Sequence, residues 1–138
     1  DGNDRFEELA STLGKPDYID TMQEDLAPSL VFQKFLADAA HATCDRLMLA
    51  EYARAHDARV YFVHADEDST VESEPAAVDA NLRHLLLRFH GRRLGEGAPE
   101  LARWSWLLES ATFVTGEPRR GWHSVCVGLM THPDFYTY

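Results

Sequence analysis

The chain has 138 residues, of which 45% are hydrophobic and 26% are charged, a composition that suits one globular domain with a buried core. Its 13 Lys and Arg residues are outnumbered by 23 Asp and Glu residues, which gives a formal net charge of −10. This charge disfavours binding to nucleic acid and docking on anionic lipid, and it is compatible with a basic protein partner.

No window of the sequence approaches the roughly 20 consecutive apolar residues that a membrane-spanning helix needs, so we expect no direct membrane span. The chain begins at Asp1 rather than at Met and shows no signal-peptide pattern. This start is expected either of a processed chain or of a piece of a longer one.

Five segments have the apolar spacing of three and four residues that predicts amphipathic helices. The first is short, about residues 4–13, and Gly14 would end it. The four main segments cover about residues 28–54, 75–91, 99–114 and 118–131, and each begins at a proline, which favours the first turn of a helix. Pro133 would stop the last one. Residues 1–138 are therefore predicted to form a single all-α domain, a compact bundle of about four main helices.

Two segments between the first and second main helices lack helical spacing. Residues 59–64 are rich in β-branched and aromatic side chains, which is typical of a strand, although a lone strand cannot satisfy its own edges. An extended loop, a continuation of the helix, and pairing with residues 112–115 or with another chain all remain open. Residues 65–74 form an acidic loop with five carboxylates and no glycine, which favours a solvated linker over a calcium-binding loop.

Each of the two cysteines follows a histidine by three residues, in His41-Ala-Thr-Cys44 and His123-Ser-Val-Cys126. On a helix this spacing places both side chains on one face. Three outcomes are open: a disulfide between Cys44 and Cys126, two buried thiols, or a zinc site made by His41, Cys44, His123 and Cys126. The zinc site would depart from the C-x₂₋₄-C spacing of known structural sites.

Positions on a helical wheel separate the cysteines from the histidines. Cys126 falls within the apolar stripe that contains Trp122, whereas His123 lies at the edge of that stripe. Cys44 lies near the border of the stripe on its own helix, and His41 lies further towards the polar face. This arrangement favours contact between the two cysteines over convergence of all four side chains.

The chain carries no catalytic signature, so we expect a non-catalytic protein and predict no cofactor. It has no G-x-S-x-G elbow, no H-E-x-x-H motif and no glycine-rich phosphate loop. It also lacks the C-x-x-C-H sequence that attaches haem covalently. Haem b, held by a histidine and Met130, is the haem alternative that remains.

Large aromatic residues are concentrated near the C-terminus. Trp104 and Trp106 are about 200° apart on a helix, so they cannot both face the same core. Trp106 is expected either to meet a partner or to be covered by the terminal residues 135–138. The predicted partner-binding residues are Trp106, Tyr136 and Tyr138, together with Val60 and Phe62 of the strand-like run.

Two C-terminal stretches carry a recognisable pattern. They are Leu87-Arg-Phe-His-Gly-Arg-Arg-Leu94 and Trp122-His-Ser-Val-Cys-Val-Gly-Leu-Met-Thr-His-Pro-Asp-Phe135. The second contains W-x-x-V-C-x-x-L-x-x-x-P-x-F, at Trp122, Val125, Cys126, Leu129, Pro133 and Phe135. This part of the chain, about the last 50 residues, resembles a C-terminal region of large secreted, cytochrome-associated proteins of planctomycetes and myxobacteria. The resemblance implies an extracytoplasmic setting, which favours the disulfide, and association with electron-transfer proteins.

These observations predict a non-catalytic helical protein-interaction module. The module would be an accessory subunit of an extracytoplasmic, for example periplasmic, electron-transfer or membrane-associated complex. The alternative is a metal- or haem-binding domain that uses the two His-x-x-Cys pairs, with zinc or haem b as the bound group.

Overall fold

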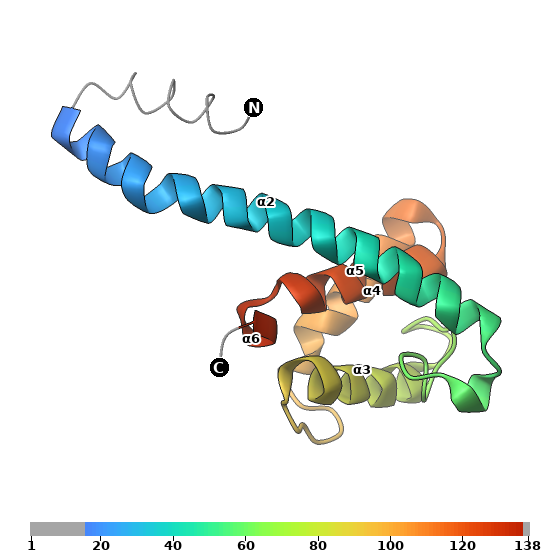
Figure 1. Cartoon of the computed structure of the whole chain (residues 1–138). Coiled ribbons are helices and arrows are strands. Elements are labelled where there is room, and N and C mark those ends of the chain that lie inside the picture. The colour runs from blue at the N-terminus through green and yellow to red at the C-terminus, as the bar shows by residue number, and fades with distance from the viewer. Residues whose placement is uncertain (1–15, 137–138) are drawn as a thin grey trace. The chain divides into compact units, whose positions relative to one another are not determined.

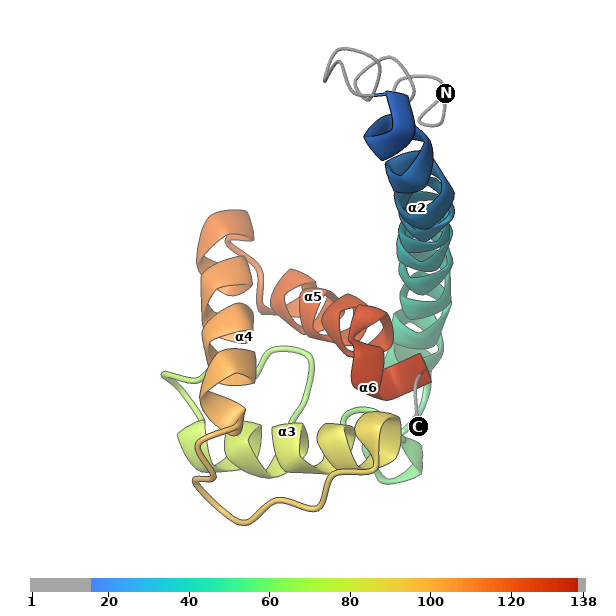
Figure 2. The same cartoon turned by 90° about the vertical axis from the view of Figure 1, so that its left-hand side faces the viewer.

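The computed structural model describes residues 16–136, and the side chains from residue 30 onward (Figures 1 and 2). Its elements are α2 (Pro16–Ala53), the short 3-10 helix η1 (His56–Ala58), α3 (Pro75–His90), α4 (Leu101–Thr115), α5 (Pro118–Thr131) and α6 (Pro133–Tyr136). No strand occurs in this part of the chain, and the predicted all-α bundle of about four main helices is confirmed. The short helix predicted over residues 4–13 lies outside the described residues, as does Tyr138.

The chain divides into two compact units, residues 1–39 and residues 40–138, and the division falls within α2. This helix begins at Pro16, so the predicted start near Pro28 is wrong. The φ of proline, about −65°, is helical, and a helix can therefore continue through a proline although it loses one hydrogen bond. In the first unit, Leu30, Val31 and Phe35 are exposed rather than buried. No helix within residues 16–136 is both long enough and apolar enough to cross a membrane.

Prolines and glycines set the ends of the helices in the second unit. Pro75 and Pro118 lie in the first turn of α3 and α5, where a missing N–H costs no hydrogen bond. Gly91 and Gly116 follow α3 and α4 with φ of 68° and 76°, a left-handed conformation that favours glycine. Pro133 comes directly after α5 has ended, as predicted, but it also begins the short helix α6.

Three buried aromatic rings lie at the centre of the core of the second unit. Phe62 packs edge-on against Tyr61 and Trp122, with ring centroids 4.8 and 5.6 Å apart. The Tyr61 hydroxyl donates to the carbonyl oxygen of Trp122 at 2.8 Å, and Trp122 Nε1 donates to the carbonyl oxygen of Ser69 at 3.0 Å. These bonds satisfy the polar atoms of the rings, so the aromatic area is buried without leaving an unpaired donor.

The helices α4 and α5 approach each other closely at a glycine (Figure 2). A Cβ at Gly121 of α5 would lie 3.0 Å from the carbonyl oxygen of Leu108 and would overlap the hydroxyl of Thr112. Because residue 121 has no side chain, the two backbones can come together at this point. Figure 2 also shows α4 lying across α3, with the chain between them running back along α3 to the start of α4.

Cys44 of α2 and Cys126 of α5 form a disulfide, which confirms the predicted bond. Their Cα atoms are 6.0 Å apart, and the two residues are separated by 82 positions in the sequence. Both cysteines are fully buried, and Met130 Sδ lies 3.8 Å from Cys44 Sγ. In the chain-entropy model, closing a loop of this length stabilises the fold by about 4–5 kcal/mol.

Residues 59–64 form a loop with bends at residues 60–64, neither a strand nor a continuation of the helix, because two buried side chains replace the partners that a sheet would supply. The Glu51 carboxylate accepts the N–H groups of residues 60–62, at 3.1, 2.8 and 3.0 Å. The side-chain oxygen of Asn81 accepts the N–H groups of residues 63–64, at 3.0 and 2.9 Å. The strand-like composition thus reflects burial of this loop, not membership of a sheet.

The Glu51 carboxylate is held in its charged form although its side chain is fully buried. Burial raises the pKa of this carboxyl, but the hydrogen bonds from residues 60–62 and from Arg54 outweigh burial and lower the pKa below its ordinary value. Arg54 Nη1 lies 2.6 Å from Glu51 Oε2. Asn81 is equally buried, and its Nδ2 has no hydrogen-bond partner among the described residues.

The acidic loop, residues 65–74, is not uniformly solvated, contrary to the prediction. Glu67 is almost fully buried, and Arg59 Nη1 donates to its Oε1 at 2.7 Å. This hydrogen bond lowers the pKa of Glu67 below its ordinary value. Ser69 is fully buried and donates to Glu74 at 2.8 Å. Glu67 therefore fixes the loop against its neighbours, whereas Asp68, Glu72 and Glu74 are exposed to water as predicted.

Candidate functional site

The disulfide excludes the Cys₂His₂ metal site considered from the sequence, because its sulfurs are not available as thiolate ligands. The two histidines of that set still lie near each other, with the ring centroids of His41 and His123 5.7 Å apart. His123 Nε2 is 2.7 Å from Asp45 Oδ1, which forms an ion pair when the imidazole is protonated. The two His-x-x-Cys pairs therefore separate into a disulfide and a histidine pair.

The predicted partner-binding residues lie in different environments. Trp106 and Val60 are 66% and 47% exposed, so both are accessible to a partner. Phe62 is fully buried in the aromatic core, and its prediction as a contact residue is wrong. The loop donates hydrogen bonds to Glu51, one of them from the N–H of Phe62, and this holds the Phe62 side chain in the core. Tyr136 is half-buried, and Tyr138 lies beyond the described part of the chain.

One face of α4 carries large apolar side chains that are exposed to solvent. Trp106, Phe113 and Val114 are 66%, 88% and 81% exposed. Separations of seven and eight residues place Phe113 and Val114 on the same side of the helix as Trp106. Glu109, which is also exposed, lies between Trp106 and Phe113 on this side. We call these four residues the α4 face.

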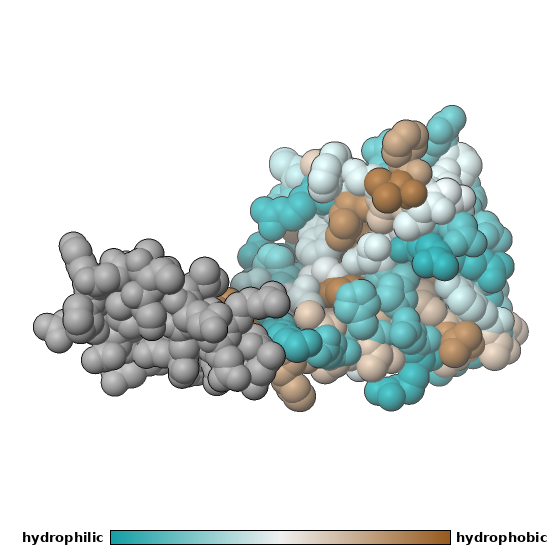
Figure 3. Space-filling model, turned by 90° about the horizontal axis from the view of Figure 1, so that it is seen from above, coloured by the Kyte–Doolittle hydropathy of each residue, from teal (hydrophilic) through white to brown (hydrophobic). Residues whose placement is uncertain are grey.

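The described end of the chain does not cover the α4 face. Phe135 of α6 packs against Phe89 of α3, with ring centroids 6.0 Å apart, so the alternative in which the terminal segment covers Trp106 is not observed up to Tyr136. Phe113 also borders a cavity of about 270 Å³, between α4 and the acidic loop. On the face seen in Figure 3, apolar side chains form separate brown areas among hydrophilic ones.

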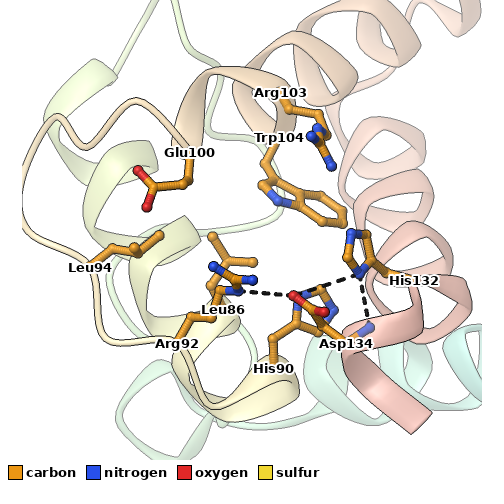
Figure 4. Close-up of a pocket in the computed structure, with 9 residues that line it drawn as sticks. All are labelled: Leu86, His90, Arg92, Leu94, Glu100, Arg103, Trp104, His132 and Asp134. Carbon is orange, nitrogen blue, oxygen red and sulfur yellow. Dashed lines mark hydrogen bonds and ion pairs between the residues drawn. The ribbon is translucent and has the colours of Figure 1, made fainter. Parts of the chain in front are cut away.

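Two histidines and an aspartate from different elements meet at another cavity, of about 190 Å³ (Figure 4). His90 is the last residue of α3, His132 follows α5, and Asp134 lies in the first turn of α6. Each offers one nitrogen or oxygen atom, and these three atoms lie within 4.8 Å of one another. The other lining residues are Leu86, Arg92, Leu94, Glu100, Arg103 and Trp104. All three members of this histidine–aspartate cluster are half-buried.

Hydrogen bonds to the backbone determine which ring nitrogen of each imidazole can offer a lone pair in its neutral form. His90 Nε2 lies 2.8 Å from the carbonyl oxygen of Leu129, and a carbonyl can only accept, so Nε2 carries the proton and Nδ1 a lone pair. The backbone N–H of Asp134 donates to His132 Nδ1 at 3.0 Å, so this nitrogen also carries a lone pair. The histidine–aspartate cluster therefore combines two imidazole lone pairs with a carboxylate.

Charged neighbours act on both the acid and the base of this cluster. Arg92 Nε donates to Asp134 Oδ2 at 2.9 Å, and this hydrogen bond holds the pKa of the Asp134 carboxyl below its ordinary value. Burial lowers the pKa of His132, and electrostatic interactions with His90, Arg103 and Arg92 lower it further, against the opposing effect of Asp134. His132 is therefore neutral and Asp134 is ionised near pH 7, the states in which both can bind a cation.

The sequence prediction did not contain the histidine–aspartate cluster. His90 and His132 lie within the two stretches that carry the resemblance, and Pro133, next to His132 and Asp134, was predicted only to stop a helix. The signal present in the sequence is that all three residues lie at helix ends, where side chains of different helices can converge.

Comparison of the chain with protein-family models, with curated proteins and with solved structures finds no match.

Proposed function

We propose that the chain is a non-catalytic helical module that binds a protein partner through the α4 face, as an accessory subunit of an extracytoplasmic electron-transfer or membrane-associated complex. The exposure of Trp106, Phe113 and Val114 on one side of a single helix carries this proposal. Large aromatic residues are enriched among the side chains that dominate binding energy at protein interfaces. Burying these three would remove considerable apolar area from water.

The composition of the α4 face indicates the chemistry of the partner. Trp106 and Phe113 are seven residues apart, the spacing with which a helix places two anchors in an apolar groove. Glu109 lies between these anchors, and the whole chain carries a formal charge of −10. A partner with an apolar groove and a basic rim would bury the two rings and pair with the carboxylate.

The disulfide supports the proposed location, because such bonds form and persist in oxidising compartments. The resemblance of residues 87–94 and 122–135 to secreted, cytochrome-associated proteins supports the association with electron-transfer proteins. In such a complex this chain would supply contacts, and its partner would supply the redox group. Haem b bound by this chain itself stays a prediction, and a visible spectrum of the purified protein with and without added haem tests it.

The proposal is tested with a Trp106→Ala/Phe113→Ala double variant. Both side chains are mostly exposed, so the variant should fold as well as the wild type. Wild-type and variant chains would be immobilised and exposed to an envelope extract of the source organism, and bound proteins would be cross-linked and quantified by mass spectrometry. We expect a partner that is enriched with the wild type and lost with the double variant.

Leu49→Ala provides the matched control, because Leu49 is 69% exposed on α2 and is not part of the α4 face. This variant should retain the partner. Equal recovery of the partner with the wild type and with the double variant would contradict the proposal. A partner of acidic surface, or sedimentation showing only self-association through α4, would contradict the proposed chemistry.

A further inference from the structure

We propose that His90, His132 and Asp134 form a binding site for Zn²⁺, separate from the α4 face and independent of the two His-x-x-Cys pairs. Imidazole nitrogen and carboxylate oxygen are ordinary zinc ligands, and three protein ligands leave one coordination position open. The set also lacks the four or more further oxygen ligands that Ca²⁺ would require. The site would bind other divalent transition metals that favour imidazole, and Zn²⁺ is the probe that defines it.

The distances in the cluster are close to those that a bound ion needs. Ligand atoms about 2.0–2.1 Å from a tetrahedral zinc ion are separated from one another by about 3.3 Å. Here the three ligand atoms lie within 4.8 Å of one another, so side-chain rotations that bring them closer by about 1.5 Å would complete the geometry. All three side chains are half-buried, which leaves them room to make this adjustment.

The groups around the ligands have the arrangement expected of an outer coordination shell. A histidine that binds a metal usually donates its other ring N–H to a carbonyl or carboxylate, which fixes the ring and the tautomer. His90 does this through Nε2 to the carbonyl oxygen of Leu129, which leaves Nδ1 for the metal. Arg92 holds the carboxylate of Asp134 in a comparable way.

At His132, the ion would take the place of the backbone N–H of Asp134 as the partner of Nδ1. Asp134 lines a cavity of about 190 Å³, from which water could bind the N–H once it is released. The same cavity offers the open coordination position to water or to a small ligand. The ion would also join the end of α3 to α6, in addition to the contact between Phe89 and Phe135 and the ion pair between Arg92 and Asp134.

Two other histidine pairs in the described part of the chain provide internal controls. The rings of His64 and His84 lie 5.9 Å apart, and those of His41 and His123 lie 5.7 Å apart. Neither pair belongs to a group of three ligand atoms as close as those of the histidine–aspartate cluster. Specific zinc binding should therefore depend on the cluster and not on these pairs.

The test is a titration of the oxidised, chelator-treated chain with Zn²⁺ in competition with a chromophoric chelator, repeated with Co²⁺ to record its visible absorption. We expect one ion per chain, and Co²⁺ bands typical of nitrogen and oxygen ligands. His132→Asn and Asp134→Asn should each weaken binding by about tenfold or more. His84→Asn and His123→Asn should bind Zn²⁺ like the wild type.

Asp134→Asn keeps the volume of the side chain and lies near the surface, so it separates loss of a ligand from loss of the fold, which circular dichroism would verify. The proposal is overturned if the wild type takes up no stoichiometric Zn²⁺. It is equally overturned if binding persists in a His90→Asn/His132→Asn variant, or if a control variant loses binding as fully as His132→Asn. Because both cysteines are in the disulfide, zinc bound by free thiols cannot produce a positive result.

Discussion

Two polar clusters in this chain, Glu51 with Asn81 and the histidine–aspartate cluster, differ in how deeply their hydrogen-bond acceptors are buried and in how many donors each acceptor binds. Glu51 and Asn81 are fully buried, and between them they accept the N–H groups of residues 60–64. The histidine–aspartate cluster is half-buried, and its acceptors receive single hydrogen bonds, from Arg92 to the Asp134 carboxylate and from the backbone N–H of Asp134 to His132. The comparison indicates that fully buried acceptors that each bind several backbone N–H groups hold a fold together, whereas half-buried acceptors with a single donor can exchange that donor for a ligand.

Glu51→Ala should have the largest effect on stability, because it disrupts the buried cluster, which consists of Glu51, Asn81 and the N–H groups of residues 60–64. The substitution leaves three backbone N–H groups without an acceptor and an empty space where the carboxylate was. We therefore expect the free energy of unfolding to fall by about 4 kcal/mol or more. Urea unfolding of the oxidised protein measures this loss. Glu72→Ala removes an exposed carboxylate and should change stability by less than about 0.5 kcal/mol. A loss below about 1 kcal/mol for Glu51→Ala would contradict the structural role.

Asn81→Ala should have the next largest effect, about 2–3 kcal/mol, because two backbone N–H groups lose their acceptor. The loss is expected to be smaller than for Glu51→Ala, since the substitution also removes the unpaired Nδ2 that the native fold already buries. The same urea unfolding experiment measures it. An unchanged midpoint would show that this loop does not depend on Asn81.

Acidification should destabilise the buried cluster by a smaller amount than deletion of its side chain. The pKa of Glu51 is lower in the folded than in the unfolded state, so its contribution is present above the unfolded pKa of about 4.3 and is lost as pH falls through the folded pKa. Thermal unfolding between pH 7 and pH 2.5 measures this loss. Glu51→Gln, which cannot ionise, should show a shallower decline below pH 4.3, and identical pH profiles would contradict the assignment.

His132→Asn should have the smallest effect on stability in the absence of metal, less than about 0.5 kcal/mol, because its side chain is half-buried and its nitrogen only accepts a bond from an accessible N–H. Chemical unfolding in the presence of a chelator measures the difference. A loss of more than about 2 kcal/mol would indicate that His132 acts as Glu51 does, in the fold itself. That result would contradict the proposal that the buried cluster stabilises the fold whereas the histidine–aspartate cluster is available to a ligand.

The helices of the second unit were predictable because their signals are local. Pro75 and Pro118 fix the starts of α3 and α5, and Gly91 lies just beyond the end of α3. The disulfide was among the predicted outcomes because the wheel placed both cysteines towards the core. The start of α2 was mispredicted because Pro28 is compatible with the interior of a helix as well as with its first turn.

The two polar clusters were not predictable, because each is made by residues that are remote in sequence. Glu51 lies on a helix and has the sequence context of a solvated carboxylate, and nothing local shows that three amides will point at it. Residues 59–64 were left open between a strand, a loop and a helix for the complementary reason: nothing local shows that the side chains of Glu51 and Asn81 will bind their amides. His90 and His132 meet only once α3 has packed against the junction of α5 and α6.

The disulfide also determines how the chain would carry a mechanical load. A pulling force applied to the two ends of the chain would be transmitted through the disulfide from Cys44 to Cys126. The residues between the two cysteines would therefore bear no load. A segment of 82 residues corresponds to roughly 290 Å of extended chain, which would be released only after reduction of the bond. Glu51, Asn81 and His90 lie within this shielded segment, whereas His132 and Asp134 lie outside it. The buried cluster therefore lies in the part of the chain that bears no tension, whereas the histidine–aspartate cluster joins that part to a segment that bears it.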